Sequence, residues 1–173
     1  HMTMFVVTSW VGEWSGFKDA FDDGHEIASH GSSHPNGQAE PASNLKPSQE
    51  TIKQNVPGEM CVTFAYPNCK PVHGVTDVYI AARTCGSDNP NSKSPSDWAG
   101  IQSRIFGEPQ GPNDAQSMNS FANTAANQNG WSVYLHHGVG EKGQLVSKDH
   151  QYTVTDINAL KEHLQYLDEN RDK

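Results

Sequence analysis

The sequence predicts an α/β fold built on a parallel sheet. Short apolar runs typical of strands alternate with stretches of helical character, and no hairpin signal such as Asn-Gly joins two neighbouring strands. The length of 173 residues fits one domain with a continuous core. We therefore expect a single domain over residues 1–173, in which His1 and Met2 are a remnant of an expression vector.

The N-terminal elements are predicted by residue type and by glycine and proline breaks. Met4 to Val11 (MFVVTSWV) is rich in β-branched and aromatic residues and predicts a strand buried on both faces at its start. Lys18 to Ala28 predicts a short helix broken at Gly24, followed by a short strand from His25 to Ser29. The polar residues 35–47 predict a loop.

The remaining elements follow the same alternation. A helix is predicted from Ser48 to Val56, with Glu50 in its first turn, and Pro57-Gly58 ends it. The later predictions are strands at Met60 to Tyr66 and Val78 to Thr84, a polar loop from Cys85 to Pro95, a helix near Asp114 to Asn127 and a strand from Trp131 to His136.

The C-terminal segment from Thr155 to Asn170 predicts a helix with one apolar face. Its apolar residues recur every three or four positions: Ile157, Leu160, Leu164 and Leu167. Thr155 can serve as the N-cap.

Composition excludes several classes of partner. The net charge of −8 and pI of about 5.5 argue against nucleic acid and favour a neutral or cationic ligand. No apolar run approaches the roughly 20 residues of a membrane-spanning helix, so no membrane partner is expected. Cys61, Cys69 and Cys85 form no CxxC pair, and one disulfide with a free thiol is compatible with them in any pairing.

Two histidines are the strongest chemical signal. His30 and His34 stand four residues apart with only Gly31 and two serines between them, so both imidazoles can converge on one divalent ion. The alternative is a pair of polar loop residues. His25, which enters a strand beside Ile27, is interpreted as a hydrogen-bonded structural histidine.

The segment GHEIASHGSSHP resembles the second motif of the polysaccharide deacetylases of the NodB-homology type, in which two such histidines bind zinc or a related ion. MFVVTSWVG resembles the strand before that motif, FAYPNC a motif in the groove wall, and WSVYLHHGVG the strand of the catalytic histidine. The resemblance implies an incomplete, distorted (β/α) barrel and His30 and His34 as metal ligands. The expected metal is zinc, with cobalt or nickel as alternatives.

Three further parts of the site are implied by this resemblance. The family pattern selects His137 over His136 as the general acid, unless both are strand-end histidines bonded to backbone. Asp97 and Trp98 weakly resemble the motif whose aspartate tunes that acid and whose tryptophan walls the sugar pocket. A surface aspartate beside a packed tryptophan is the alternative.

FAYPNC departs from the family pattern at two positions. Ala65 stands where the family has an arginine that steadies the catalytic aspartate, and Asn68 stands where it has an aromatic residue. The departure suggests that Tyr66 and Pro67 shape the pocket and that the backbone N–H near Asn68 binds the oxyanion. Tyr66 fits the hydrophobic core equally well.

The first family motif, Thr-Phe-Asp-Asp, supplies the catalytic base and a third ligand, and it has no counterpart before the first strand. Phe21-Asp22-Asp23-Gly24 has similar letters but follows that strand, so we interpret it as coincidence. The chain is therefore expected to be a barrel truncated at both ends, with an exposed sheet edge that invites self-association.

These expectations converge on a metal-dependent hydrolase that removes acetyl groups from acetylated polysaccharide or oligosaccharide. It would act as an acetyl xylan esterase or as a deacetylase of an N-acetylglucosamine polymer. The alternative is a catalytically impaired module that binds metal and glycan without efficient turnover. By the same resemblance we expect a secreted or cell-envelope protein.

Overall fold

The computed structural model describes residues 1–146 and 152–172. These residues form two compact units. Unit 1 comprises residues 1–84 and 97–101, and unit 2 comprises the described residues of 85–96 and 102–173. The prediction of a single domain stays a prediction, and each unit is described by itself.

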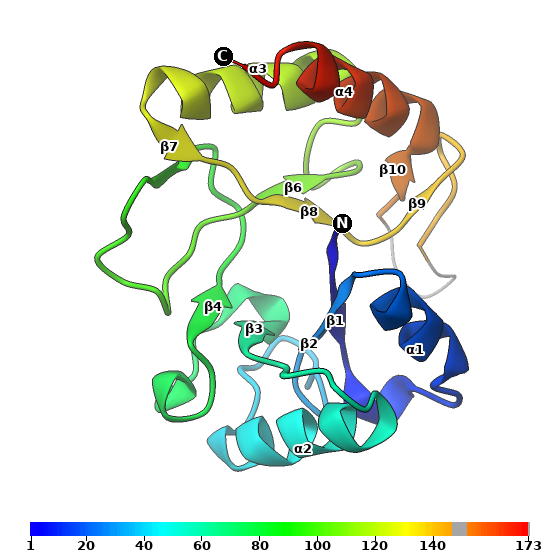
Figure 1. Cartoon of the computed structure of the whole chain (residues 1–173), viewed down its shortest axis with the longest axis vertical. Helices are drawn as coiled ribbons and strands as arrows, with labels where there is room; N and C mark the ends of the chain where they lie inside the picture. The colour runs from blue at the N-terminus through cyan, green and yellow to red at the C-terminus, as the bar shows by residue number, and fades with distance from the viewer. Residues whose placement is uncertain (147–151, 173) are drawn as a thin grey trace. The chain divides into compact units, whose positions relative to one another are not determined.

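Unit 1 contains a four-stranded sheet in which every pair of neighbouring strands is parallel (Figure 1). The strands lie in chain order: β1 (Thr3–Val6), β2 (Glu26–Ser29), β3 (Thr63–Ala65) and β4 (Ala81–Arg83). Short 3-10 turns lie at Thr8–Trp10, Ala42–Asn44, Pro67–Cys69 and Val75–Asp77. The mixed α/β fold with a parallel sheet is therefore confirmed, whereas the barrel stays a prediction.

The helices of unit 1 are α1 (Ser15–Asp22) and α2 (Leu45–Asn55). Both contribute to one core cluster. Val6, Ile27 and Phe64 of the sheet lie in that cluster with Ile52 of α2, and Phe17 of α1 packs against it. Because side chains alternate along a strand, the residues between these core positions point to the other face of the sheet.

The first strand and the second helix of unit 1 have other bounds than the sequence predicted. The first strand ends at Val6 rather than Val11, because the chain turns into a 3-10 segment in which Trp10 N–H donates to Val7 O at 3.0 Å. Met4 and Phe5, which point to opposite faces at the predicted start, are both half-buried rather than fully buried. Helix α2 begins at Leu45, before Ser48, because Pro47 lies in its first turn, where a missing N–H breaks no helical bond.

Unit 2 is made of short paired strands and two longer helices. The parallel pairs are β6 (Arg104–Phe106) with β8 (Tyr134–His136) and β9 (Val139–Gly140) with β10 (Thr155–Asp156); the antiparallel pair is β5 (Asn91–Ser92) with β7 (Gly130–Trp131). Helices α3 (Ala115–Asn127) and α4 (Ile157–Glu169) lie side by side (Figure 1). The core of the unit is formed by Phe106, Met118, Phe121 and Ala159.

The predicted strand from Trp131 to His136 is two strands. It divides because β7 pairs with β5 whereas β8 pairs with β6, so the chain changes partner between Trp131 and Tyr134. The helix predicted near Asp114 to Asn127 is confirmed, with Asp114 as its N-cap accepting from Ser117 N–H at 2.7 Å.

Helix α4 is confirmed, but its cap is not the predicted residue, and its predicted apolar face is buried only in part: Leu160 packs against the core of unit 2. Asp156 is the N-cap and accepts from Asn158 N–H at 3.0 Å, because the Thr155 hydroxyl is buried and donates to Phe106 O at 3.0 Å. Leu164 is 55% exposed. The buried positions of the helix are Ala159 and His163.

Within the described residues, no helix combines the length and apolar character needed to cross a membrane.

Candidate metal centre

His30 follows the last residue of β2 and is oriented by the neighbouring strand. Its Nδ1 lies 2.8 Å from the carbonyl oxygen of Ala65, which can only accept a hydrogen bond. Nδ1 therefore carries the proton in the neutral ring, and the lone pair is on Nε2. A backbone carbonyl on one ring nitrogen is the usual way in which a metal-binding histidine is held in one orientation.

The loop after β2 brings the second histidine to the first. The ring centroids of His30 and His34 are 4.9 Å apart, and the planes meet at 65°. The ring of Trp10 also lies against His34, with centroids 5.2 Å apart. The structure thus brings together the two side chains that the sequence singled out.

A buried carboxylate shapes this loop. Glu40 is 2% exposed and accepts hydrogen bonds from the backbone N–H groups of Ser32, Ser33 and His34 at 2.7, 2.9 and 2.9 Å. Asn44 Nδ2 donates to the same carboxylate at 2.9 Å. Successive N–H groups that converge on one anion form a recurrent backbone nest.

Hydrogen bonds stabilise the charged form of the buried Glu40 carboxylate. Burial alone would raise its pKa, but the hydrogen bonds from Asn44 and from the three backbone N–H groups together lower the pKa below its ordinary value. Gly31 makes room for this carboxylate, because a Cβ atom there would lie 2.5 Å from Glu40 Cδ. Gly31 also has a φ of +83°, which glycine adopts without steric cost.

Sequence reasoning missed Glu40. The available signal was its isolation, since it is the one acidic residue in the polar segment 35–47. An acid surrounded by Gly, Ser and Asn is a ready acceptor for loop N–H groups.

The ligands present fit part of a zinc shell. The two imidazoles, one of them held by a carbonyl, could supply two of the four ligands that zinc usually binds. Among the residues that the structure describes, no group of three or more His, Cys, Asp or Glu side chains gathers around a common point. Water or another oxygen donor would complete the shell.

The residues at the end of β3 have structural partners. Tyr66 is 2% exposed and its ring lies against Phe64, with centroids 5.6 Å apart, which agrees with the core alternative. Burial, followed by the charge of Asp97, raises the pKa of Tyr66. Asn68 Nδ2 donates to Pro35 O and to Gln38 O, both at 2.8 Å, and so ties this end of β3 to the loop after His34. Substrate contacts of Tyr66 and Asn68 stay predictions.

Asp97 and Trp98 lie in the segment of unit 1 that returns beside β4. Asp97 Oδ1 accepts from Ala99 N–H at 2.9 Å, and Ala82 N–H donates to Trp98 O at 2.8 Å. The Trp98 residue is 50% exposed. Their roles in catalysis and sugar binding stay predictions.

The aspartates of FDDG are remote from the histidine pair along β2. Asp22 forms an ion pair with Lys18 at 2.6 Å on α1, and Asp23 caps the end of that helix. Both precede β2, whereas His30 follows it. His25 Nδ1 accepts from Met2 N–H at 3.1 Å, which confirms its structural role.

In unit 2, His136 and His137 differ in environment. His136 Nδ1 lies 2.7 Å from Thr155 Oγ1, and burial, with smaller contributions from His163 and His137, lowers the pKa of His136 to about 4. His137 lies just beyond β8, is exposed and contacts the Tyr152 ring, with centroids 4.5 Å apart. Its role as general acid stays a prediction.

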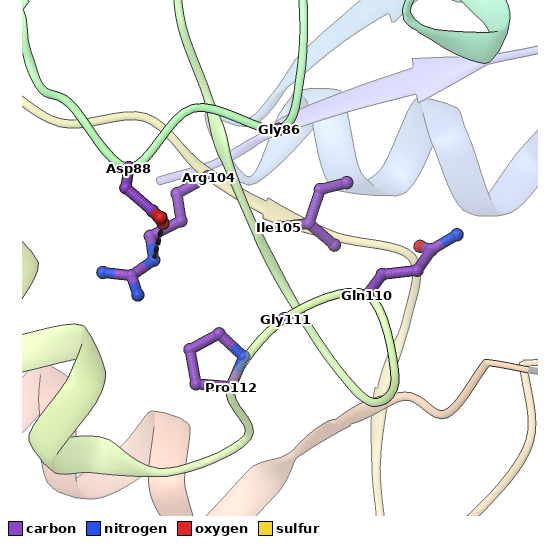
Figure 2. A pocket seen from close by; sticks show the side chains of 7 residues that line it. All are labelled: Gly86, Asp88, Arg104, Ile105, Gln110, Gly111 and Pro112. Carbon is purple, nitrogen blue, oxygen red and sulfur yellow. Dashed lines mark ion pairs between the residues drawn. The ribbon is translucent and has the colours of Figure 1, made fainter.

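Unit 2 also contains a pocket of about 250 Å³. Figure 2 shows the ion pair at its edge, in which Arg104 Nε lies 3.0 Å from Asp88 Oδ1. The lining residues are Gly86, Asp88, Arg104, Ile105, Gln110, Gly111 and Pro112. None of the predicted site residues lines this pocket.

Comparison with known proteins supports the resemblance for the first half of the chain. Residues 1–83 match the family model for polysaccharide deacetylase. No curated protein and no solved structure gave a significant match. The matched range contains His30, His34, MFVVTSWVG and FAYPNC, and it ends next to the boundary of unit 1 at residue 84. The resemblance to the NodB-homology polysaccharide deacetylases is therefore confirmed over residues 1–83.

Proposed function

We propose that the chain is a metal-dependent hydrolase that removes acetyl groups from polysaccharide. The observation that carries the proposal is the His30–His34 pair, held by Ala65 O and by Glu40 within the region that matches the family. The substrate is an acetylated xylan or an N-acetylglucosamine polymer.

In this proposal His30 and His34 hold one divalent ion, zinc first and cobalt or nickel as alternatives. A divalent ion supplies Lewis-acid catalysis when it is bound. Because Nδ1 of His30 donates its proton to Ala65 O, Nε2 would be the nitrogen that binds the ion.

His137 is proposed to give a proton to the departing sugar oxygen or nitrogen. Asp97 is proposed, from the family resemblance, as the residue that tunes this acid. Trp98 would wall the sugar, and Tyr66 with the backbone N–H near Asn68 would line the acetyl site. The proposal also includes a barrel-like sheet and self-association through a sheet edge. The protein would be secreted or located in the cell envelope.

A second function is a module that binds metal and glycan without efficient turnover. The observation that favours it is the donor set, since in the described part of the chain no third acidic or histidine side chain gathers with the pair. A general base is worth roughly 10²–10⁴-fold in rate, so a chain without one would release acetate slowly.

Elemental analysis and acetate release test both functions. We expect about one divalent ion per chain and metal-dependent release of acetate from acetylated xylan or chitin oligomers. The double variant His30→Ala/His34→Ala should lose the ion and the release. His73→Ala, which removes an exposed histidine of the same unit, is the matched control and should keep both.

The outcomes separate the alternatives. Metal and glycan binding without acetate release would favour the binding module. A double variant that retains the same ion would overturn the metal centre and with it both functions.

A further inference from the structure

Arg83 differs from the other arginines of this chain. The sequence contains three arginines, and two of them have a carboxylate partner: Arg104 pairs with Asp88 and Arg171 pairs with Asp168. Arg83 has none among the described residues, which is unusual in a chain of net charge −8. Its guanidinium carbon instead lies 4.8 Å from the centre of the Phe5 ring.

The register of the sheet places this cation on the same face as His30. Arg83 pairs with Ala65, and Phe5 pairs with Ala28. Ser29 pairs with Phe64. Since Phe64 lies in the core cluster with the two helices, its neighbour Ala65 and the residues that share its side point to the opposite face.

Arg83 therefore reaches from β4 across two intervening strands to Phe5 on β1. In this register Arg83 is level with Ala65 of β3 and with His30 of β2. Phe5 is level with Ala28, which precedes His30 on the same face of β2. His30, the next residue on the same face of β2, donates to Ala65 O at 2.8 Å. The guanidinium and the candidate metal ligand thus share one face of unit 1.

The environment of Arg83 favours an anionic ligand. Burial lowers the pKa of Arg83 to about 10, so the group stays charged at neutral pH but at a cost that no counter-ion in the described residues offsets. A cation–π contact uses the flat face of a guanidinium group. The N–H donors lie in the plane of the group and point outward, so they remain able to bind the two oxygens of a carboxylate.

We propose that Arg83 anchors a carboxylate-binding site on the face of the unit 1 sheet opposite α1 and α2. The ligand is a planar carboxylate of the size of acetate, either free acetate or the carboxylate of an acidic sugar. The inference rests on the proposed function in one respect, because acetate is the product of that reaction. The sequence drew attention to Ala65 as the position without the family's arginine, and the structure pairs that position with Arg83.

Nuclear magnetic resonance of the full chain tests the site without any activity measurement. With ¹⁵N labelling, the chain has three arginine Nε–H signals, and the one that disappears in Arg83→Lys belongs to Arg83. We expect a saturable shift of this signal on addition of sodium acetate, compared with sodium chloride at equal ionic strength. Arg104 and Arg171 already hold carboxylates and serve as internal controls.

Two ligand arms identify the source of the carboxylate. A response to acetate but not to glucuronate would assign the site to the free acid, whereas a response to glucuronate and not to glucose would assign it to an acidic sugar. No acetate or glucuronate response of the Arg83 signal beyond that of chloride, or an equal shift of all three signals, overturns the proposal.

Variants separate this site from the metal centre. Arg171→Gln should leave the Arg83 response unchanged. Arg83→Lys and Arg83→Gln should reduce acetate affinity at least tenfold, measured on backbone amide signals near Ala65, with the rest of the amide spectrum showing that the fold is kept. His30→Ala/His34→Ala should retain the acetate response, so failure of the proposed hydrolase would leave the Arg83 proposal standing.

Discussion

At the scale of single residues, the conformation of the loop that carries His34 depends on Glu40, which is not one of the two proposed metal ligands. Glu40 gathers three consecutive backbone N–H groups, including that of His34, and is itself buried. Hydrogen bonds to a charged group are worth about 1.5–3 kcal/mol each. The loop is therefore held in one conformation before any ion arrives, which reduces the entropy lost on binding.

Glu40→Gln tests this positioning role. The amide presents an NH₂ group to backbone donors that need an acceptor, so the loop should relax and zinc affinity should fall by about 10–100-fold, the usual effect of disturbing the groups behind metal ligands. Zinc competition titration measures the affinity. Glu50→Gln, on the exposed side of α2, is the control and should not change it. Unchanged affinity in Glu40→Gln, with the fold intact, would contradict the role.

At the scale of elements, helix α4 shows how an apolar pattern can mislead. Its leucines recur at helical spacing, yet Leu164 is 55% exposed, and the contact with α3 uses Ala159 and His163. His163 Nδ1 pairs with Asn119 Oδ1 at 2.8 Å, and its ring lies 4.8 Å from that of Tyr134. A small residue and a hydrogen-bonded ring let two helices approach in a way that hydrophobic periodicity does not encode.

Substitutions on the two sides of this helix pair should differ in cost. Leu164→Glu should change the free energy of unfolding by less than about 0.5 kcal/mol, as surface changes usually do. Met118→Ala, at a fully buried position of α3, should cost about 2–5 kcal/mol. Urea denaturation measures both. A core-like loss for Leu164→Glu would show that this face is covered.

Local signals in the sequence were enough for some features and not for others. The break at Gly24 and the start of a helix near Asp114 are encoded within a few residues, and so is the spacing of His30 and His34. The Glu40 contacts could not be predicted in the same way, because their donors are backbone groups common to every residue. The Arg83 placement depends on strand order and register, which only the assembled sheet defines.

At the scale of the whole molecule, the chain leaves unit 1 after residue 84, returns for residues 97–101 and leaves again. The returning segment is bound to β4 by backbone hydrogen bonds: Ala82 N–H to Trp98 O at 2.8 Å, and Ile101 N–H to Ala82 O at 3.0 Å. Arg83 also forms a parallel bridge with Ile101. Residues from both sides of the intervening segment thus belong to one compact unit.

A single cut in the intervening segment should therefore not separate the fragments. With a specific protease site inserted after Lys93, which is exposed, the two pieces should co-elute in native buffer and separate in denaturant. Size-exclusion chromatography with mass spectrometry measures this. Separation in native buffer would contradict the role of residues 97–101 in unit 1, and the uncut insertion variant controls for effects of the inserted sequence.

The close approach of Gly31 and Glu40 also constrains how relatives of this chain can diverge. A side chain at position 31 would meet the carboxylate at 2.5 Å and would need the φ of +83° that disfavours L residues. The two positions should therefore covary. A lineage that replaces Gly31 has to shorten residue 40 as well, and it then needs another acceptor for the N–H of His34, so the histidine pair, the glycine and the glutamate are expected to be inherited or lost together.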